Sequence, residues 1–264
     1  MTDLSYSNPQ RIICLTEEFT EIIYLLGREE LIVGISGFTV RPKIARKTKP
    51  KVCTFIDANY DKIESLKPDL IFAFSDLQAD ICRELIKRGF NVMCFNQRSV
   101  KDILNVILVV GSIIGENKKT EILLKEIISK IEKTGRTYEN RHRPKVYFEE
   151  WDEPMISGIR WVAELIELCG GEYIFPDRMY GNLAKDRIVK SGEVIERNPD
   201  IIIGSWCGKP VKKNIITSRE GWNKINAVKN NHIYEIKSAI ILQPGPAALT
   251  EGINEIQKIL SCVK

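Results

Sequence analysis

Four carboxylates within five residues form the densest group of potentially reactive side chains in the sequence. They are Glu149, Glu150, Asp152 and Glu153, and Trp151 lies among them. Carboxylates at this spacing can act as general acid and base, and they can also bind a hard cation. An enzyme or a metal-binding protein that uses residues 149–153 is therefore one hypothesis for this chain.

Other features of a catalytic centre are missing from the sequence. His142 stands between two arginines and His232 stands in a predicted turn before a strand, positions typical of solvated histidines. The chain has no Walker A motif, no Rossmann glycine fingerprint, no Gly-x-Ser-x-Gly and no Cys-x-x-Cys. We therefore predict no catalytic residue, no metal site and no catalytic cofactor, and we predict that the protein is not an enzyme.

Aromatic side chains recur where predicted strands end. Phe55, Phe74, Trp151 and Trp206 lie at such positions, whereas Trp161 begins a predicted helix and should be structural. Aromatic rings supply a large contact area at a low cost in conformational entropy, so a group of them suits a flat, bulky, largely apolar ligand. Such rings can also pack in the core, and for Phe55, Phe74 and Trp206 both interpretations stay open.

The elements that would position these side chains occur twice. Residues 63–73 and 194–204 share the order of a helix end, a Pro-Asp turn and an apolar run. Proline ends the helix, and a continuous apolar run is typical of a parallel strand that is covered on both faces. Similar elements surround both copies: strands at 11–15, 91–95, 145–149 and 233–236, and helices at 17–26, 78–88, 161–169 and 218–229. This alternation predicts an α/β fold of two Rossmann-like lobes with parallel sheets.

A long helical region lies between the two copies. It covers residues 99–134, with a predicted break at Gly115 and apolar residues at helical spacing after the break. We therefore predict an N-terminal lobe over 1–115, a linking helix and connector over 116–141 and a C-terminal lobe over 142–264. Parallel α/β sheets bind ligands at the carboxyl ends of their strands, so a cleft between two such edges is the expected ligand site.

Composition argues against several classes of partner. The 39 basic and 35 acidic residues are interspersed, apart from a basic run over 41–51 that we interpret as a solvated loop, so no nucleic-acid partner is expected. No apolar stretch approaches the length of about 20 residues that a membrane span needs. The first residues lack the pattern of a signal peptide, and seven isolated cysteines suggest buried thiols in a reducing compartment. We predict a monomeric cytoplasmic protein, or a periplasmic or cell-surface one if a leader precedes this sequence.

Several segments resemble the cobalamin- and siderophore-binding class of ABC-transporter substrate-binding proteins. Residues 11–27 look like that family's first strand and helix, and residues 52–74 and 172–206 look like its two Pro-Asp units. A branch labelled cobalamin-binding protein, many of whose members appear without signal peptides, is closer still, because its motifs are echoed at 150–158, 161–171, 206–208 and 243–246. The resemblance covers about residues 10–260, and it implies two lobes joined by one long helix, as in class III periplasmic binding proteins.

The resemblance implies a bulky ligand held between the lobes: cobalamin or a related corrinoid, with a ferric siderophore or haem as the alternative. The ligand would pass to an ABC permease or be held in the cytoplasm. Asp61 matches an acidic position that docks onto permease arginines, and Glu193 lies near a second one, although both also fit as ordinary acids at helix N-termini. The residues expected near the ligand are Phe38, Arg41, Phe55, Phe74, Glu150, Trp151, Met155, Trp206 and Gln243.

Two departures from the family pattern bear on the ligand. Phe55 replaces a common tryptophan, and Gln243-Pro-Gly-Pro-Ala replaces the usual Arg-Pro-Gly-Pro-Arg. The second change removes two cations and so argues against an anionic or phosphate-bearing ligand. A ferric siderophore or haem would instead depend on Arg41 or Arg160.

Overall fold

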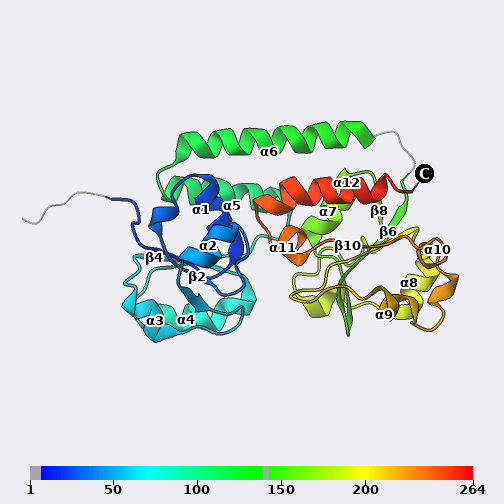
Figure 1. Cartoon of the computed structure of the whole chain (residues 1–264), viewed down its shortest axis with the longest axis horizontal. Coiled ribbons are helices and arrows are strands. Elements are labelled where there is room, and N and C mark those ends of the chain that lie inside the picture. The colour runs from blue at the N-terminus through cyan, green and yellow to red at the C-terminus, as the bar shows by residue number, and fades with distance from the viewer. Residues whose placement is uncertain (1–6, 139–142, 264) are drawn as a thin grey trace, which may run out of the picture. The chain divides into compact units, whose positions relative to one another are not determined.

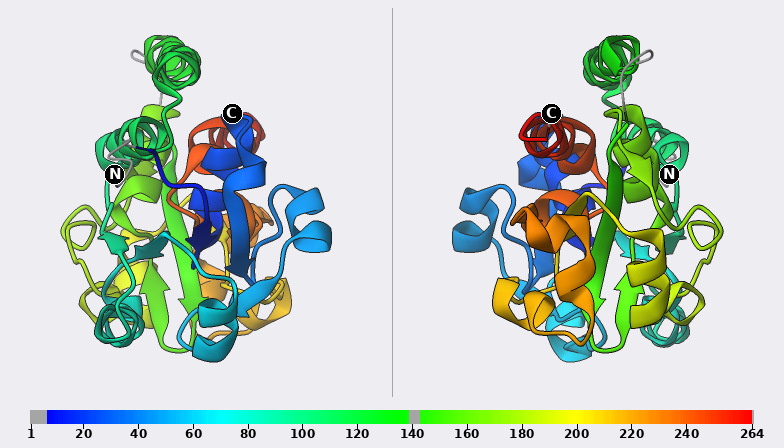
Figure 2. Two further views of the ribbon diagram at one scale, coloured as in Figure 1. Left: turned by 90° about the vertical axis from the view of Figure 1, so that its left-hand side faces the viewer. Right: turned by 90° about the vertical axis from the view of Figure 1, so that its right-hand side faces the viewer.

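The computed structural model describes residues 7–138 and 143–263, which form two compact units. Unit 1 contains the chain up to Gln97 together with Lys101–Lys125, and unit 2 contains Arg98–Val100 together with the chain from Glu126 onward. The change from unit 1 to unit 2 at Lys125 and Glu126 falls within helix α6 (Asn117–Tyr138), which is one unbroken helix in Figure 1 and is seen end-on in Figure 2. His142 and the end of the predicted connector lie outside the described residues.

Unit 1 is built on a parallel sheet in the strand order β3-β2-β1-β4-β5. The strands are β1 (Ile12–Cys14), β2 (Ile32–Ser36), β3 (Lys51–Cys53), β4 (Leu70–Phe74) and β5 (Val92–Phe95). The helices between them are α1 (Glu17–Leu25), α2 (Lys43–Thr48), α3 (Tyr60–Ser65) and α4 (Ala79–Lys87). Strands β1 and β4 are buried at every residue, which explains why both are continuous apolar runs in the sequence.

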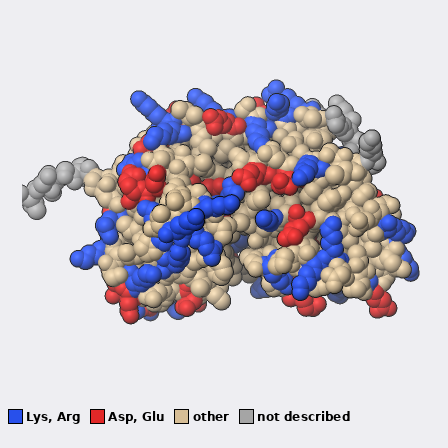
Figure 3. Space-filling model, viewed as in Figure 1, with Lys and Arg blue, Asp and Glu red and all other residues tan. Residues whose placement is uncertain are grey.

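The basic run at residues 41–51 contains a helix where a loop was expected. Only Ala45 of α2 is fully buried, and Lys43, Arg46 and Lys47 are exposed. One small apolar residue on the inner side is enough to anchor this short helix, while the long basic side chains stay in water. Figure 3 shows Lys and Arg side chains gathered over α2. The prediction of a loop was therefore wrong, although the charges are solvated as expected.

Unit 2 contains a second five-stranded sheet, in the order β10-β9-β6-β7, with β8 also pairing with β6. The strands are β6 (Lys145–Asp152), β7 (Met155–Ser157), β8 (Glu172–Tyr173), β9 (Ile201–Gly204) and β10 (Ile233–Glu235). The predicted α/β fold is confirmed, but β7 runs antiparallel to β6 and makes this sheet mixed. Only Glu153 and Pro154 join β6 to β7, and a connection of two residues permits a hairpin but not a parallel crossover.

The helices of unit 2 include one departure from prediction. They are α7 (Arg160–Leu168), α8 (Ser191–Arg197), α9 (Lys213–Thr217), α10 (Asn226–Lys229), α11 (Ser238–Ile241) and α12 (Ile253–Leu260). The single helix expected over 218–229 is wrong. Gly221 has a φ of +78° in the middle of that segment, and a left-handed residue interrupts a right-handed helix.

The predicted break at Gly115 is confirmed. Helix α5 (Val100–Ile113) ends before Gly115, which has a φ of +78°, and α6 begins at Asn117. The two helices meet at Gly111 and Thr120, where a Cβ on the glycine would lie 1.8 Å from the threonine Oγ1. Among the helices of the described ranges, none combines the length and the apolar character that a bilayer crossing needs.

Candidate ligand-binding site

Apolar side chains are exposed at the carboxyl edge of the unit 1 sheet. Phe38 follows β2, Ile56 follows β3 and Leu77 follows β4, and these side chains are 55%, 73% and 56% exposed. Because the carboxyl ends of parallel strands share one edge of a sheet, the three belong to the same edge. Phe38 was predicted from the sequence, whereas Ile56 and Leu77 were missed because a single aliphatic residue in a loop has no distinctive pattern.

Gln78 holds the strand ends of this edge together. Its Oε1 accepts a hydrogen bond from the Phe74 amide at 3.1 Å, and its Nε2 donates to the main-chain oxygens of Leu15 and Phe55, both at 3.2 Å. The side chain is fully buried, so these bonds connect the ends of β4, β1 and β3 without competition from water. Sequence reasoning did not identify Gln78, since its role depends on three partners that are distant along the chain.

The other predicted residues of unit 1 differ in how much surface they offer. Phe55 is half-buried, and Phe74 is only 6% exposed, so Phe74 belongs mainly to the core. Arg41 is half-buried and its Nε lies 3.1 Å from Glu21 Oε1. The positive charge of Arg41 is thus already matched by a carboxylate of the same unit.

Unit 2 has a pocket of about 810 Å³ beside the carboxyl end of β6. Its walls come from the β6–β7 hairpin, from the turn entering α8 and from the segment before the Trp222 turn: residues 152–155, 189–192, 195 and 219–221. The volume falls within the range typical of small-molecule sites. Met155, which was predicted as a ligand contact, lines this pocket, and Glu150, Trp151, Trp206 and Gln243 do not.

A buried carboxylate lies beneath this pocket. Glu149 has no exposed surface and accepts from both terminal nitrogens of Arg219, at 2.5 and 3.0 Å. Tyr147 Oη and Trp206 Nε1 also donate to it, each at 3.1 Å. Burial, followed by the negative charge of Glu149, raises the pKa of Tyr147 well above its ordinary value. Glu149 is therefore a fully hydrogen-bonded anion that holds Arg219, a residue of the pocket wall.

Two of the neighbouring acids, Glu150 and Asp152, also form ion pairs. Arg187, which is 2% exposed, contacts Glu150 through both terminal nitrogens at 2.5 and 3.1 Å. Lys209 Nζ lies 2.5 Å from Asp152. Burial opposes ionisation of Asp152, but the hydrogen bond and charge of Lys209 outweigh it and lower the pKa of this carboxyl. These ion pairs leave little capacity for acid–base chemistry. No three His, Cys, Asp or Glu side chains of residues 7–138 and 143–263 form a group that could hold a metal ion.

Trp151 and Trp206 both lie close to the same cation, Lys209. Lys209 Nζ lies 4.0 Å from the centre of the Trp151 ring and 5.0 Å from that of Trp206. Trp206 is only 2% exposed, so little of its surface is available to a ligand. Trp161 is also buried and donates from Nε1 to the Ile241 oxygen at 2.8 Å, so it is structural as expected.

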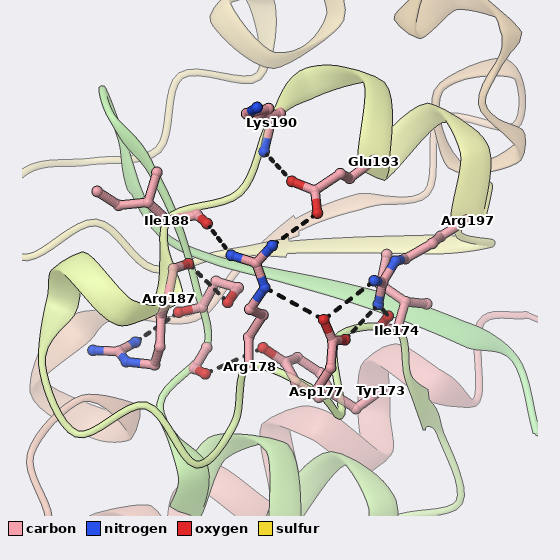
Figure 4. A network of polar contacts seen from close by, with 11 residues as sticks. Tyr173, Ile174, Asp177, Arg178, Arg187, Ile188, Lys190, Glu193 and Arg197 are labelled. Carbon is pink, nitrogen blue, oxygen red and sulfur yellow. Dashed lines mark hydrogen bonds and ion pairs between the residues drawn. The ribbon is translucent and has the colours of Figure 1, made fainter.

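Hydrogen bonds and ion pairs made by Arg178 and Arg197 surround the segment 189–192, which lines the unit 2 pocket (Figure 4). Arg178 donates to the Ile188 oxygen at 2.7 Å and to Glu193 at 2.9 Å, and Asp177 accepts from Arg178 and Arg197. Glu193 also accepts from the Lys190 amide at 2.8 Å, which anchors the turn at residues 190–192. Glu193 is thus engaged within its own unit.

Three further predicted residues are Asp61, Gln243 and Arg160. Asp61 is exposed in the first turn of α3, Gln243 is half-buried after α11, and Arg160 pairs with Glu164 at 2.8 Å one helical turn away. Of these, only Asp61 offers an unobstructed charge to solvent. The roles expected for all three stay predictions.

Comparison with known proteins identifies relatives over most of the chain. A family model described as periplasmic binding protein matches residues 12–240. An uncharacterized ABC transporter substrate-binding lipoprotein, YvrC of Bacillus subtilis (strain 168), is 27% identical over 259 residues, covering 94% of this chain and 79% of the relative. A vitamin B12-binding protein of Vibrio vulnificus (strain YJ016) is 26% identical over 247 residues, covering 91% of this chain and 86% of the relative.

Solved structures share the fold. A possible iron-binding (periplasmic solute-binding) protein from Staphylococcus epidermidis ATCC 12228 has a TM-score of 0.80 at 25% identity, covering 96% of this chain and 99% of its own. The periplasmic vitamin B12-binding protein BtuF of Vibrio cholerae has a TM-score of 0.77 at 20% identity, covering 97% and 98%. The periplasmic heme-binding protein RhuT from Roseiflexus sp. RS-1 has a TM-score of 0.78 at 19% identity, covering 95% and 98%.

These neighbours confirm the predicted fold of the class III periplasmic-binding-protein type, and the last two show the fold alone. The family match extends from the first strand of unit 1 to α11 of unit 2. The chain belongs to the periplasmic binding protein family.

Proposed function

We propose that this chain is the substrate-binding component of an ABC-type importer and that its ligand is cobalamin or a related corrinoid. Its family, a relative named as an ABC transporter substrate-binding lipoprotein and others named as vitamin B12-binding proteins support this assignment. An ABC permease is then the protein partner. These relatives include a lipoprotein and periplasmic proteins, so we place the chain outside the cytoplasm, and the cytoplasmic expectation finds no support among them.

The observation that carries the proposal is the set of exposed apolar side chains at the carboxyl edge of unit 1. Phe38, Ile56 and Leu77 each leave more than half of their surface in water. Covering an aliphatic or aromatic side chain with a ligand contributes about 1–2 kcal/mol. A flat, largely apolar macrocycle can cover several of them at once, which a small polar ligand cannot.

The pocket of unit 2 contains polar groups that suit the proposed ligand. These are Lys190, Ser191, Arg219 and Glu220, together with main-chain groups of the turn into α8. A corrinoid carries carboxamide side chains around its ring, and these need both donors and acceptors. The mixture of hydroxyl, carboxylate and cationic groups in the pocket meets that need, and Met155 adds a polarizable apolar contact.

Calorimetric titration with cyanocobalamin tests the proposal. We expect saturable one-to-one binding, weakened about fivefold to tenfold in each of the variants Ile56→Ala and Leu77→Ala. Ile86→Ala is the matched control. Ile86 is 59% exposed near the carboxyl end of α4, whereas Leu77 lies just before the amino end of that helix. No binding of cyanocobalamin by the intact chain would exclude the corrinoid. Equal losses from Ile56→Ala and Ile86→Ala would exclude the edge of unit 1 as its site.

Haem is the second candidate, and one tyrosine favours it. Tyr180 is 66% exposed in unit 2, and the Arg160 guanidinium carbon lies 5.0 Å from the centre of its ring. A tyrosine oxygen can ligate ferric haem iron. Titration with haemin should then produce an absorbance band that Tyr180→Phe abolishes. Ferric siderophores, the remaining alternative, belong in the same titration series.

A further inference from the structure

Two thiols of unit 1 face each other across the interface between α4 and β5. Cys82 lies on α4 within a buried apolar cluster that also contains Ile81 and Leu85, and Val92 of β5 packs against this cluster. Side chains two residues apart in a strand point to the same face, so Cys94 points toward α4 as Val92 does. The Cys82 and Cys94 side chains share a hydrogen bond, and both cysteines are free thiols.

The two thiols have unequal environments. Cys94 is exposed on β5, an edge strand, while Cys82 is 7% exposed. The hydrogen bond from Cys82 lowers the pKa of Cys94 to about 7, against the opposing effects of burial and of Asp76. The same hydrogen bond, together with burial, raises the pKa of Cys82. An exposed thiolate next to a buried second thiol is the usual arrangement of a reactive cysteine and its resolving partner.

The other thiols lack this arrangement. Burial raises the pKa of Cys53 and Cys169 to about 12, and it also raises the pKa of the buried Cys14. Cys207 is exposed, but partial burial raises the pKa of its thiol. Cys262 is exposed near the end of α12. The Cys82–Cys94 pair is therefore chemically distinct from these five thiols.

We propose that Cys94 and Cys82 form a redox-active pair that a hydroperoxide converts into an intramolecular disulfide. The Cys94 thiolate attacks one peroxide oxygen, the O–O bond breaks, and Cys94 becomes a sulfenic acid while the other oxygen leaves as an alcohol or water. The Cys82 sulfur then attacks the Cys94 sulfur, the S–O bond breaks, and the hydroxyl leaves as water with the Cys82 proton. The two thiols are oxidised by two electrons and the peroxide is reduced by two.

The position of the pair links it to the carboxyl edge of the sheet. Cys94 Sγ lies 3.7 Å from the Ser75 oxygen, and the Ser75 amide donates to the Phe95 oxygen at 2.7 Å. Ser75 begins the turn that carries Leu77 and Gln78, and its φ of +65° makes that turn sensitive to strain. A disulfide would join α4 to β5 next to this turn, whichever ligand the chain binds.

Oxidation of the reduced full chain with hydrogen peroxide, followed by alkylation with N-ethylmaleimide and peptide mass spectrometry, tests the pair. We expect a Cys82–Cys94 disulfide peptide as the main product, formed about tenfold faster at pH 7 than the modification of Cys207, because the pKa of Cys94 is lowered and that of Cys207 is raised. The oxidised protein should also unfold several degrees higher than the reduced protein.

Two variants separate the roles. Cys82→Ser should stop the reaction at a sulfenic acid on Cys94 that dimedone traps, and Cys94→Ser should leave Cys82 alkylatable only after unfolding. Cys207→Ser is the control and should still form the disulfide. The proposal is overturned if Cys207 reacts as fast as Cys94, or if Cys82→Ser gives the same product as the parent chain. Because none of these readouts involves ligand, its failure would leave the proposed function untouched.

Discussion

Glu149 and Arg219 form a two-point ion pair in which the carboxylate is completely buried and the guanidinium forms part of the wall of the unit 2 pocket. They are 70 residues apart in the chain, and both terminal nitrogens of the arginine are used. The pair connects the central strand β6 to the segment before α10. The buried carboxylate of Glu149 therefore holds Arg219 in its position in the pocket wall.

Removing one partner of this pair should be costly. Glu149→Gln leaves the Arg219 charge largely buried without a counter-ion, so we expect a loss of about 3–5 kcal/mol in the free energy of unfolding. Urea denaturation measures this loss. Glu153→Gln, an exposed acid of the same segment, should change stability by less than about 0.5 kcal/mol. Equal effects of the two substitutions would mean that the pair does not stabilise unit 2.

The buried amide of Gln78 should matter for both stability and ligand binding. Gln78→Met keeps the approximate volume but removes three hydrogen bonds, so we expect a loss of about 2–4 kcal/mol in unfolding free energy. Affinity for the ligand should fall as well, because the ends of β1, β3 and β4 are no longer held together. Asn91→Ala, which removes one exposed hydrogen bond to the Asp69 oxygen, serves as the control and should cost less than about 1 kcal/mol.

Close approach of α5 and α6 should make Gly111 intolerant of any side chain. In Gly111→Ala the new Cβ would lie 1.8 Å from Thr120 Oγ1, so we expect a loss of about 1–3 kcal/mol in stability. Adding Thr120→Ala should restore part of it, since the nearest atom is then removed. Gly192→Ala is the comparison, because no atom lies within 4 Å of the place that its new Cβ would take, and the change should be neutral or slightly stabilising. A harmless Gly111→Ala would contradict the helix contact.

Two buried glutamates of α1 should make stability depend on pH. Burial raises the pKa of Glu17 to about 7 and of Glu18 to about 8, above the value of about 4.3 expected in the unfolded chain. The folded state then binds more protons, so their contribution to stability is complete below pH about 4 and is lost as the pH rises through 7 and 8.

Urea denaturation at several pH values tests this dependence. Glu18→Gln should be less sensitive to pH than the parent chain between pH 5 and 9 and should be the more stable of the two at pH 9. Glu121→Gln changes an exposed acid on α6 and should keep the parent profile. If Glu18→Gln retains the full slope, Glu18 is ionised in the folded state and the assignment of its pKa is wrong.

The proposed partnership with a permease gives a separate prediction for Asp61. Reversing its charge in Asp61→Lys should leave corrinoid affinity unchanged and lower stimulation of the permease several-fold, because surface charges act on association between partners. Asp80→Lys, another exposed acid of unit 1, is the control. A transport assay in reconstituted vesicles compares how strongly the two variants stimulate the permease. Equal transport by the two variants would exclude Asp61 from docking.

Local patterns predicted the elements of this protein well. The apolar runs after Pro68-Asp69 and Pro199-Asp200 became β4 and β9, and Gly115 separates α5 from α6. These features depend on the proline ring, on the burial of both sheet faces and on the conformational freedom of glycine, all of which act within a few residues. The resemblance to substrate-binding proteins was likewise visible in the sequence and was confirmed by the family match.

Only the tertiary structure decided which side chains are available at the site. In the sequence, nothing distinguishes Glu149 from the acidic residues next to it. In the structure it is a buried ion-pair partner, whereas Glu153 is exposed. Trp206 and Phe74 were candidates for ligand contact and are nearly covered, whereas Ile56 and Leu77 are open to solvent. Burial and ion pairing are set by residues that are distant along the chain. The sequence therefore determined the two α/β folding units and their family, and the packing between distant segments determined the chemistry of each surface.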